Sequence, residues 1–381
     1  MIYFDNAATT YPKPKQVIRA VEEAMIFCGA NPGRSGNQMS YLTASKIFEV
    51  RESLSNLFNL NSPENVIFTK NCTEALNLVI HGLQRKGGHF LCSNYEHNSV
   101  TRPLQYLKEQ NLCDWGYFEV KPSVVDTLKN IQNKIQKNTI AIICTATSNV
   151  TGLCMPIQDI ATLAHQNGLK LIVDGAQGAG IIPVYMQKMN LDYLCLPGHK
   201  GLYGPMGTGA LLCRNTECLK TLMQGGTGTQ SKEYAMPMAV PERYESGTLN
   251  VPGIIGVGAG CKQIEELSIK KIYDKEQYWI RYLVEELKKM KSFELYKPNM
   301  QSYLYAPILA LNIQNMHSEE VATLLAEDEI AVRGGFHCAP LAHKTLKTLD
   351  RGVVRICPSI FTTEKDVNCL LNSLFKIAKK R

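Results

Sequence analysis

Short apolar segments alternate with helix-like segments through the first two thirds of the chain. This pattern predicts strands over residues 66–69, 89–93, 141–146, 169–174, 193–196 and 209–213. Between them the apolar positions follow a helical period, for example over 73–83 and 156–168. Several of the strands are continuously apolar, which is typical of strands covered by helices on both faces. The fold class is therefore expected to be α/β with a mainly parallel sheet.

The pattern changes near residue 260. A long charged amphipathic segment, 262–290, predicts one connecting helix. Beyond it we expect strands over 304–313 and 329–335 and helices over 318–328 and 362–380. Thr363 and Asp366 are placed as a variant capping box for the last helix. These elements predict a smaller α+β unit.

The length agrees with two domains, since 381 residues exceed what one hydrophobic core usually serves. We assign 16–259 to the large domain, and 1–15 with 260–381 to the small one. Hydrophobic residues make up 45% and charged residues 20%, values that disfavour disorder and a membrane protein. No apolar run approaches the roughly 18 residues of a membrane span, and the N-terminal residues do not resemble a signal peptide. We expect a cytoplasmic location.

The cysteine content and the charge distribution disfavour other classes of protein. The 13 cysteines form no CxxC pair and no cluster at zinc spacing, so we expect reduced thiols and no metal. The net charge of +7 is spread along the chain without a basic block, which disfavours nucleic-acid binding. Small anionic ligands are sufficient to explain it.

Two charged residues follow predicted strands. Asp174 ends the strand 169–174, where open α/β sheets bind ligands, although alone it could simply cap the next helix. Lys200 follows the strand 193–196 and precedes a Gly-rich loop. A lysine amine can condense with an aldehyde and a carboxylate can pair with a pyridine nitrogen, so the two predict pyridoxal phosphate. A Walker-type phosphate loop is disfavoured because Gly201 stands where Ser or Thr is required.

Two further residues fit this cofactor. Thr73 lies at the start of the predicted helix 73–83, where a hydroxyl and free amides favour a phosphate dianion. The same geometry would serve a simple N-cap. His97 follows the strand 89–93 and could stack on a pyridine ring, although a single histidine is more often structural.

Taken together, the chain resembles the class V aminotransferases, and within them the cysteine desulfurases and selenocysteine lyases. Nine segments carry the resemblance in the family's order: 3–10, 71–77, 95–99, 147–152, 173–177, 198–209, 243–250, 333–340 and 353–367. The resemblance implies fold type I of the pyridoxal-phosphate enzymes. That fold has a large domain with a mainly parallel seven-stranded sheet, a smaller C-terminal domain, and a homodimer with active sites at the subunit interface.

The resemblance also implies a role for each matching residue. Lys200 would carry the cofactor as a Schiff base, Asp174 would contact the pyridine nitrogen, and Gln177 the phenolic oxygen. His97 would stack on the ring. Further cofactor contacts are implied for Cys72, Thr73, His199 and Asn149, and across the subunit interface for Thr227 or Thr229. The carboxylate of the substrate would be held by Arg355, Asn149 and Asn6.

Cys338 separates a desulfurase from other members of the class. Gly334 and Gly335 predict a mobile loop, and Arg333 and His337 supply groups that favour a thiolate. The resemblance implies that Lys200 removes the Cα proton of the substrate. Cys338 would then attack the substrate sulfur, which leaves a persulfide and releases alanine, while His97 assists proton transfer.

Three residues depart from the family pattern. Pro197 replaces a serine, Gly201 is an additional glycine after the lysine, and Phe336 replaces a histidine before Cys338. The sequence therefore does not fix the conformation of the loop around Lys200 or one of the contacts to the cofactor phosphate.

Several functions remain compatible with the sequence. The substrate could be L-cysteine or L-selenocysteine, and a selenocysteine lyase would use the same scaffold. Another aminotransferase, epimerase or lyase of the class would not need Cys338. A scaffold for a sulfur-transfer complex is disfavoured because Lys200, Asp174 and Arg355 are intact. A desulfurase would also imply a sulfur-acceptor protein as partner.

Overall fold

The computed structural model describes residues 1–32, 36–216, 219–298, 300 and 303–379. Its centre is a seven-stranded sheet with the order β2-β8-β7-β6-β5-β3-β4. The strands are β2 (Val66–Thr69), β3 (Gly88–Ser93), β4 (Cys113–Phe118), β5 (Thr139–Thr145), β6 (Lys170–Asp174), β7 (Tyr193–Pro197) and β8 (Gly209–Cys213). β8 pairs antiparallel with β2 and with β7, and the other four neighbouring pairs of these described strands are parallel, so the predicted mainly parallel sheet is confirmed.

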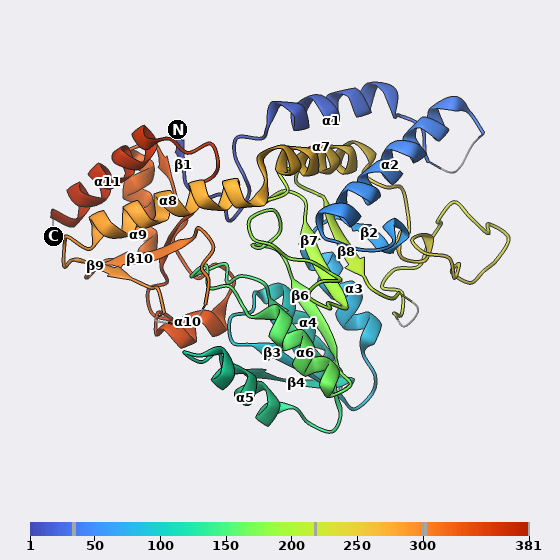
Figure 1. Ribbon diagram of the computed structural model, residues 1–381, viewed down its shortest axis with the longest axis horizontal. Coiled ribbons are helices and arrows are strands. Elements are labelled where there is room, and N and C mark those ends of the chain that lie inside the picture. The colour runs from blue at the N-terminus through green and yellow to red at the C-terminus, as the bar shows by residue number, and fades with distance from the viewer. Residues whose placement is uncertain (33–35, 217–218, 299, 301–302, 380–381) are drawn as a thin grey trace.

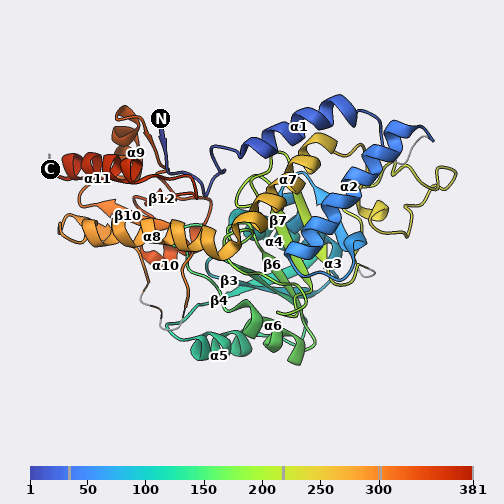
Figure 2. The same cartoon turned by 45° about the horizontal axis from the view of Figure 1, so that its top comes forward.

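Helices cover both faces of this sheet (Figures 1 and 2). They are α1 (Lys15–Phe27), α2 (Gln38–Leu57), α3 (Cys72–Leu83), α4 (Asn98–Glu109), α5 (Val124–Lys134), α6 (Ile157–Gln166) and α7 (Val251–Leu267). On one face, Val79 of α3 and Leu104 of α4 pack with Ile143 of β5. On the other, Ile160 of α6 packs with Ile142, the next residue of β5. Successive residues of one strand thus enter different cores, which explains the continuous apolar runs.

A second group of elements lies at the opposite end of the molecule from α2 and α3 (Figure 1). Its helices are α8 (Ile269–Leu287), α9 (Ser318–Glu327), α10 (Pro340–Leu346) and α11 (Glu364–Lys379). Its antiparallel sheet has the order β12 (Val354–Ile356), β10 (Leu309–Ile313) and β9 (Phe293–Leu295). The N-terminal strand β1 (Ile2–Tyr3) pairs with β11 (Ile330–Ala331) beside this group. The predicted α+β character is therefore present.

The predicted connecting helix is wrong in one respect. Residues 262–290 do not form one helix, because Ser268 has φ of 67° and separates α7 from α8. Its hydroxyl then accepts a hydrogen bond from the Lys271 amide and caps α8. The domain boundaries at 15/16 and 259/260 stay a prediction, and the second boundary falls inside α7.

Other expected elements differ mainly in their limits. The strand expected over 304–313 begins only at Leu309, and the strand expected over 329–335 reduces to β11. The last helix begins at Glu364, with Thr363 and Asp366 exchanging cap hydrogen bonds as expected. Position 380 of that prediction lies outside the described residues. No helix in the described part of the chain is both long enough and apolar enough to cross a bilayer.

Parallel strands place the candidate site. Ser93, Thr145, Asp174 and Pro197 end β3, β5, β6 and β7. Because these strands are parallel, their carboxyl ends lie along one edge of the sheet, where α/β folds hold ligands. The residues that follow each strand therefore converge there.

The packing of α7 on the loop after Lys200 can be tested at Gly260. A Cβ atom there would clash with the carbonyl oxygen of Leu202, two residues after Lys200. We expect Gly260→Ala to destabilise the protein by about 1–3 kcal/mol, because helix and loop must separate to fit a methyl group. Thermal unfolding measures this effect, with Gly29→Ala as control, since nothing lies within 4 Å of a Cβ at Gly29. Equal melting temperatures for both variants would contradict the packing.

Candidate active site

A cavity of about 240 Å³ opens at the ends of β5, β6 and β7, where Thr145, Asp174 and Pro197 border it. Nine predicted site residues line it: Cys72, Thr73, His97, Asn149, Asp174, Gln177, His199, Lys200 and Arg355. These residues come from segments far apart in the sequence. Four predicted residues do not line it: Asn6, Thr227, Thr229 and Cys338.

Asp174 is the buried anion of the cavity, with 2% of its surface exposed. Its Oδ1 accepts a hydrogen bond from the Ala176 amide at 2.8 Å and one from the Cys72 thiol at 3.4 Å. Burial and the nearby carboxylate raise the pKa of Cys72 well above its usual value. Cys72 therefore acts as a neutral donor that orients Asp174.

Lys200 lies in a loop whose backbone is held by the N-terminal segment. Thr10 Oγ1 donates to the carbonyl oxygen of Lys200 at 2.7 Å, and Lys13 Nζ donates to that of His199 at 2.7 Å. Burial lowers the pKa of Lys200, and the Asp174 carboxylate opposes this shift only in part. The amine thus loses its proton more readily than an exposed lysine, as Schiff-base chemistry requires.

The departures near Lys200 have local explanations. Pro197 ends β7 and pairs with Gly209 of β8, so it belongs to the sheet as well as to the cavity wall. Gly201 lies so close to Ala179 that a Cβ atom would clash with the carbonyl oxygen of that residue. The extra glycine therefore permits close packing of two loops.

The N-terminal turns of α3 and α4 meet through their side chains. Ser99 Oγ lies 2.8 Å from Thr73 Oγ1 and 2.8 Å from His97 Nδ1. The Ser99 amide donates to the same His97 nitrogen at 3.0 Å, so Nδ1 is an acceptor and the neutral ring carries its proton on Nε2. Burial lowers the pKa of His97, which favours that neutral ring.

His199 leaves one ring nitrogen available. Its Nδ1 is buried and has no hydrogen-bond partner among the described residues. Burial lowers the pKa of His199 to about 4, and the Lys200 and Lys13 charges act in the same direction. The ring is thus neutral and could serve a ligand oxygen.

Gln177 and Asn6 both contact the backbone. Gln177 Nε2 donates to the Ala7 carbonyl oxygen at 2.9 Å and still lines the cavity. Asn6 Nδ2 donates to the Cys357 carbonyl oxygen at 2.9 Å, and its Oδ1 accepts from the Tyr11 amide at 3.1 Å. Since both polar atoms of Asn6 are engaged, its substrate contact stays a prediction that this geometry does not favour.

Arg355 brings a buried cation to the cavity from β12. Its Nη2 pairs with Asp5 Oδ1 at 2.8 Å, and its Nη1 donates to the Asn149 carbonyl oxygen at 3.0 Å. Its Nε is buried without a partner among the described residues. A buried donor of this kind usually has a partner, so the guanidinium can bind an anion in the cavity.

Cys338 lies beside the cavity and is fixed through its backbone. Its carbonyl oxygen accepts from the Asn98 amide at 2.7 Å, at the N-terminus of α4 and next to His97. The preceding carbonyl, of His337, accepts from Asn149 Nδ2 at 2.7 Å. Both His337 and Cys338 have positive φ angles, 49° and 54°. Cys338 is the one exposed thiol among the described residues.

The residues around Cys338 differ in part from their expected roles. Gly335 forms hydrogen bonds with Val353 in both directions and with Ser318 Oγ, and a Cβ atom at Gly334 would clash with the Ser318 carbonyl oxygen. The glycines thus permit close packing, and the mobility of the loop stays a prediction. Burial lowers the pKa of His337 well below its usual value, so its ring is neutral and brings no positive charge. Phe336 is exposed and contacts the His343 ring edge-on.

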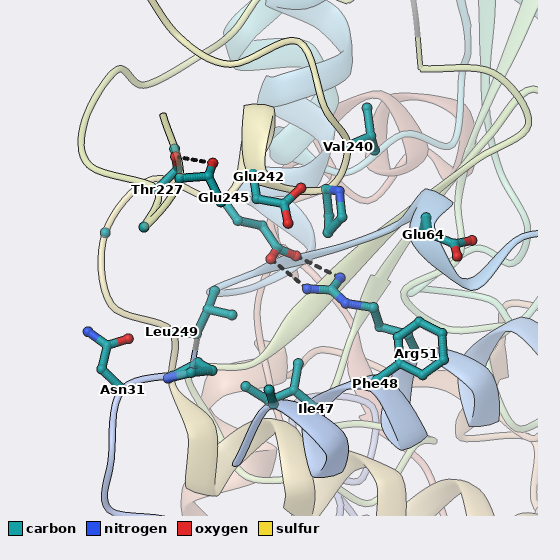
Figure 3. Close-up of a pocket in the computed structure, with 16 residues that line it drawn as sticks. Asn31, Ile47, Phe48, Arg51, Glu64, Thr227, Val240, Glu242, Glu245 and Leu249 are labelled. Carbon is teal, nitrogen blue, oxygen red and sulfur yellow. Dashed lines mark hydrogen bonds and ion pairs between the residues drawn. The ribbon is translucent and has the colours of Figure 1, made fainter. Parts of the chain in front are cut away.

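Thr227 and Thr229 lie in a different pocket, shown in Figure 3. Their hydroxyls are 3.3 Å apart beside a buried ion pair of Arg51 and Glu245, whose two N–O distances are 2.9 and 2.6 Å. The structure does not bring these threonines to the cavity of Lys200. Their predicted contact with a neighbouring subunit stays a prediction.

Three residues that contact the predicted site residues or the strands beside them were not predicted from the sequence. Asp5 and Ser99 lie inside motifs that carried the resemblance, but only the fold shows that they contact Arg355 and His97. Glu96 precedes His97 and is fully buried, with Oε1 accepting from the Thr145 amide at 2.8 Å and from the Ser93 hydroxyl. No local sequence signal distinguishes these three residues from polar residues that face solvent.

The residues present fit pyridoxal phosphate. The cavity combines an amine of lowered pKa, a buried carboxylate, two helix N-termini and two buried nitrogen atoms without partners. These are the groups that an aldehyde, a pyridine nitrogen and a phosphate require. Within the described residues, no three His, Cys, Asp or Glu side chains gather in a group that could hold a metal ion.

Comparison with known proteins identifies the family. The family model described as aminotransferase class-V matches residues 2–370. The chain belongs to this family. The family resemblance inferred from the nine segments is thereby confirmed.

Similar proteins extend over almost the whole chain. A protein of Methanothermobacter thermautotrophicus named "Probable cysteine desulfurase" is 32% identical over 99% of this chain and 94% of its own length. An Escherichia coli protein named "Cysteine desulfurase" is 30% identical over 99% and 93%. The apo structure of the cysteine desulfurase from Thermococcus onnurineus superposes with a TM-score of 0.91 at 29% identity, covering 100% of this chain and 95% of that one. The family's fold is thus present from end to end.

The buried carboxyl of Glu96 predicts a pH-dependent stability. Burial raises the pKa of Glu96 from 4.5 to about 8. Between these values the unfolded chain releases the proton and the folded chain keeps it, so Glu96 contributes less stability as pH rises through this window. Glu96→Gln removes this dependence.

We therefore expect the free energy of unfolding of Glu96→Gln, minus that of the natural protein, to increase from about pH 5 to about pH 8. Chemical denaturation at both pH values measures it. Glu109→Gln, an exposed change in α4, is the control. Parallel pH profiles for the natural protein and Glu96→Gln would show that Glu96 is ionised in the folded state.

Proposed function

We propose that the protein is a pyridoxal-phosphate-dependent cysteine desulfurase, which converts L-cysteine to L-alanine and forms a persulfide on Cys338. The observation that carries this proposal is the position of Cys338. It is the exposed thiol of the described chain, and it is anchored beside a cavity that holds Lys200, Asp174 and Arg355. The names of the full-length relatives support the same activity.

The cofactor would be held by the residues that line the cavity. Lys200 would bind its aldehyde, Asp174 its pyridine nitrogen and Gln177 its phenolic oxygen, while His97 would cover the ring. Cys72, Thr73 and His199, near the α3 N-terminus and the Lys200 loop, would contact the cofactor and its phosphate. When bound, pyridoxal phosphate supplies an electron sink for bond changes at the substrate amino acid.

The substrate carboxylate would lie against Arg355, with Asn149 beside it. The buried Nε of Arg355 is a free donor, while Asp5 and the Asn149 carbonyl fix the other two nitrogens. Because these contacts already hold the guanidinium in place, binding of a carboxylate costs little side-chain conformational entropy. The geometry thus favours an α-amino acid as substrate.

Lys200 and Cys338 would perform the chemical steps. The lowered pKa of Lys200 favours the neutral amine, which can accept the Cα proton. The Cys338 thiolate would then attack the substrate sulfur, so that an S–S bond forms as the carbon–sulfur bond breaks. The electron pair stays on the substrate carbon, which takes up a proton and becomes the methyl group of alanine. His97 would carry protons beside this step.

The partners belong to the same proposal. A homodimer would let Thr227 or Thr229 reach the cofactor phosphate of the neighbouring subunit, since both lie away from the cavity of their own chain. An exposed persulfide on Cys338 would pass its sulfur to an acceptor protein. A large cofactor-binding domain of residues 16–259 and a cytoplasmic location complete the proposal.

Reduction of the protein with borohydride tests the cofactor. We expect the purified protein to be yellow and to yield, after reduction, one peptide in which Lys200 carries the cofactor, because Lys200 is the lysine of the cavity. Peptide mass spectrometry measures the adduct, and Lys200→Ala should lose it. An adduct on another lysine would overturn the assignment of Lys200.

The role of Cys338 is tested by Cys338→Ala. This variant should keep cofactor binding and a spectral change with L-cysteine but release at least about 100-fold less sulfide and form no persulfide, because the nucleophile is missing. Sulfide and alanine assays with persulfide labelling measure these products. The matched control is Cys369→Ala, which removes the partly exposed thiol of α11.

The outcome that contradicts this role is turnover of L-cysteine by Cys338→Ala at the natural rate. The activity would then be another reaction of the family. A parallel assay with L-selenocysteine separates the substrates, since a selenolate leaves more readily and could depend less on Cys338.

A further inference from the structure

Two hydroxyl groups and an imidazole ring beside the cavity of Lys200 form one hydrogen-bonded chain. Thr73 lies in the first turn of α3, Ser99 lies in the first turn of α4, and His97 is the N-cap of α4. All three residues line the cavity. Ser99 Oγ lies 2.8 Å from Thr73 Oγ1 and 2.8 Å from His97 Nδ1. Ser99 therefore joins the residue expected at the cofactor phosphate to the residue expected at the cofactor ring.

The backbone fixes the direction of this chain. The Ser99 amide is always a donor, and it donates to His97 Nδ1 at 3.0 Å, so this nitrogen is an acceptor and carries no proton. A hydroxyl oxygen 2.8 Å from such a nitrogen must supply the proton between them, so the hydroxyl of Ser99 donates to His97. Because Ser99 has one hydroxyl proton, it must accept from Thr73 Oγ1. The hydrogen bonds run from Thr73 through Ser99 to His97.

A phosphate group competes for the proton of Thr73. Thr73 has one hydroxyl proton, which this chain directs to Ser99. A phosphate dianion is the stronger acceptor, because charge-assisted hydrogen bonds are roughly twice as strong as neutral ones. When Thr73 donates to phosphate, its oxygen and Ser99 Oγ lie 2.8 Å apart with no proton between them, unless the Ser99 hydroxyl also turns. A phosphate at Thr73 thus draws the Ser99 proton away from His97.

We propose that Ser99 is a positioning residue that couples a phosphate group bound at Thr73 to the proton affinity of His97. The proposal rests on the phosphate contact of Thr73 in the proposed function. Without phosphate, the Ser99 hydroxyl donates to His97 Nδ1 and stabilises the neutral ring. With phosphate bound, both hydroxyls rotate, and His97 Nδ1 keeps only the hydrogen bond from the amide. No proton leaves its oxygen, and the ring becomes easier to protonate when the site is occupied.

Charged groups around His97 are the same in both states of the chain. Burial lowers the pKa of the ring and Asp174 opposes this shift, while three cations lower it further: Lys200, Arg333 and Arg355. Other titratable side chains share the cavity or the segments beside the ring: Cys72, Glu96, His199, His337 and Cys338. Among the described residues, the Ser99 hydroxyl forms hydrogen bonds only with Thr73 and His97. Its removal therefore leaves these other groups in place.

The pKa of His97 in the full-length protein freed of cofactor tests the coupling, with inorganic phosphate as the probe. Isotope-labelled histidine gives at most eight ring signals in a nuclear magnetic resonance spectrum, and the signal missing from His97→Gln belongs to His97. Titration over pH, without and with saturating phosphate, gives the pKa in each state. The nitrogen shifts report which ring nitrogen carries the proton. We expect Nε2 to carry it in the neutral ring, and phosphate to raise the pKa.

Two variants separate the coupling from the direct effect of the phosphate charge. Ser99→Ala lacks the hydroxyl donor in both conditions. Without phosphate, its His97 pKa should exceed that of the natural protein by about 0.5–1 unit, and with phosphate the two values should agree. In Thr73→Val no hydroxyl turns Ser99 away from the ring, so the His97 pKa should begin at the natural value and rise less. Thr101→Val, which removes another hydroxyl from α4, is the matched control and should behave as the natural protein.

Equal phosphate-induced shifts in the natural protein and in either folded variant would overturn the proposal. So would a neutral ring that carries its proton on Nδ1, or a natural protein whose His97 pKa does not respond to phosphate. One variant is sufficient if the other folds poorly, because the two remove opposite ends of the coupling. Failure of the proposed function is read separately, since the natural protein would then release no sulfide from L-cysteine while the phosphate-dependent difference persisted.

Discussion

A carboxylate buried at the end of a parallel strand governs the electrostatics of this site. Asp174 is almost inaccessible to water, and its oxygen is satisfied by an amide and a thiol. Its charge acts on the titration of Cys72, Glu96, His97 and Lys200 together. Because a buried charge without partners is costly, these neighbours must either donate to Asp174 or stay neutral. The arrangement of the cavity follows from that requirement.

Burial separates the polar groups of the site into charged and neutral sets. Low exposure lowers the pKa of the three histidines that border the cavity, His97, His199 and His337. The same low exposure raises the pKa of the Glu96 carboxyl, because burial disfavours the charged form of both kinds of group. The fixed charge opposite Asp174 is then the guanidinium of Arg355, which keeps its own partner in Asp5.

The sequence predicted the elements whose signal is local. Continuous apolar runs identified six of the seven central strands, but β4 was missed because Asp114 and Gly116 interrupt its apolar pattern at the sheet edge. The break at Ser268 was missed because a positive φ leaves no mark in an amphipathic pattern. Asp174 could be found because it ends β6, and Lys200 because it lies in the short loop after β7. The contacts of Asp5 and Glu96 join distant segments, which periodicity cannot reveal.

The two parts of the molecule meet at the cavity of Lys200. Arg333, His337 and Arg355 reach the cavity from the C-terminal elements, whereas Asp174 and Lys200 come from the central sheet. The segment that carries Cys338 is joined to the sheet side through the carbonyl groups of His337 and Cys338, which accept from Asn149 and Asn98, and through Ala339, which is buried in the same core as the strands. Anchoring through the backbone leaves the side chain free of hydrogen-bonding duties. The proposed role of Cys338 as a nucleophile needs that freedom, and the backbone hydrogen bond to Asn98 keeps the residue next to the N-terminus of α4.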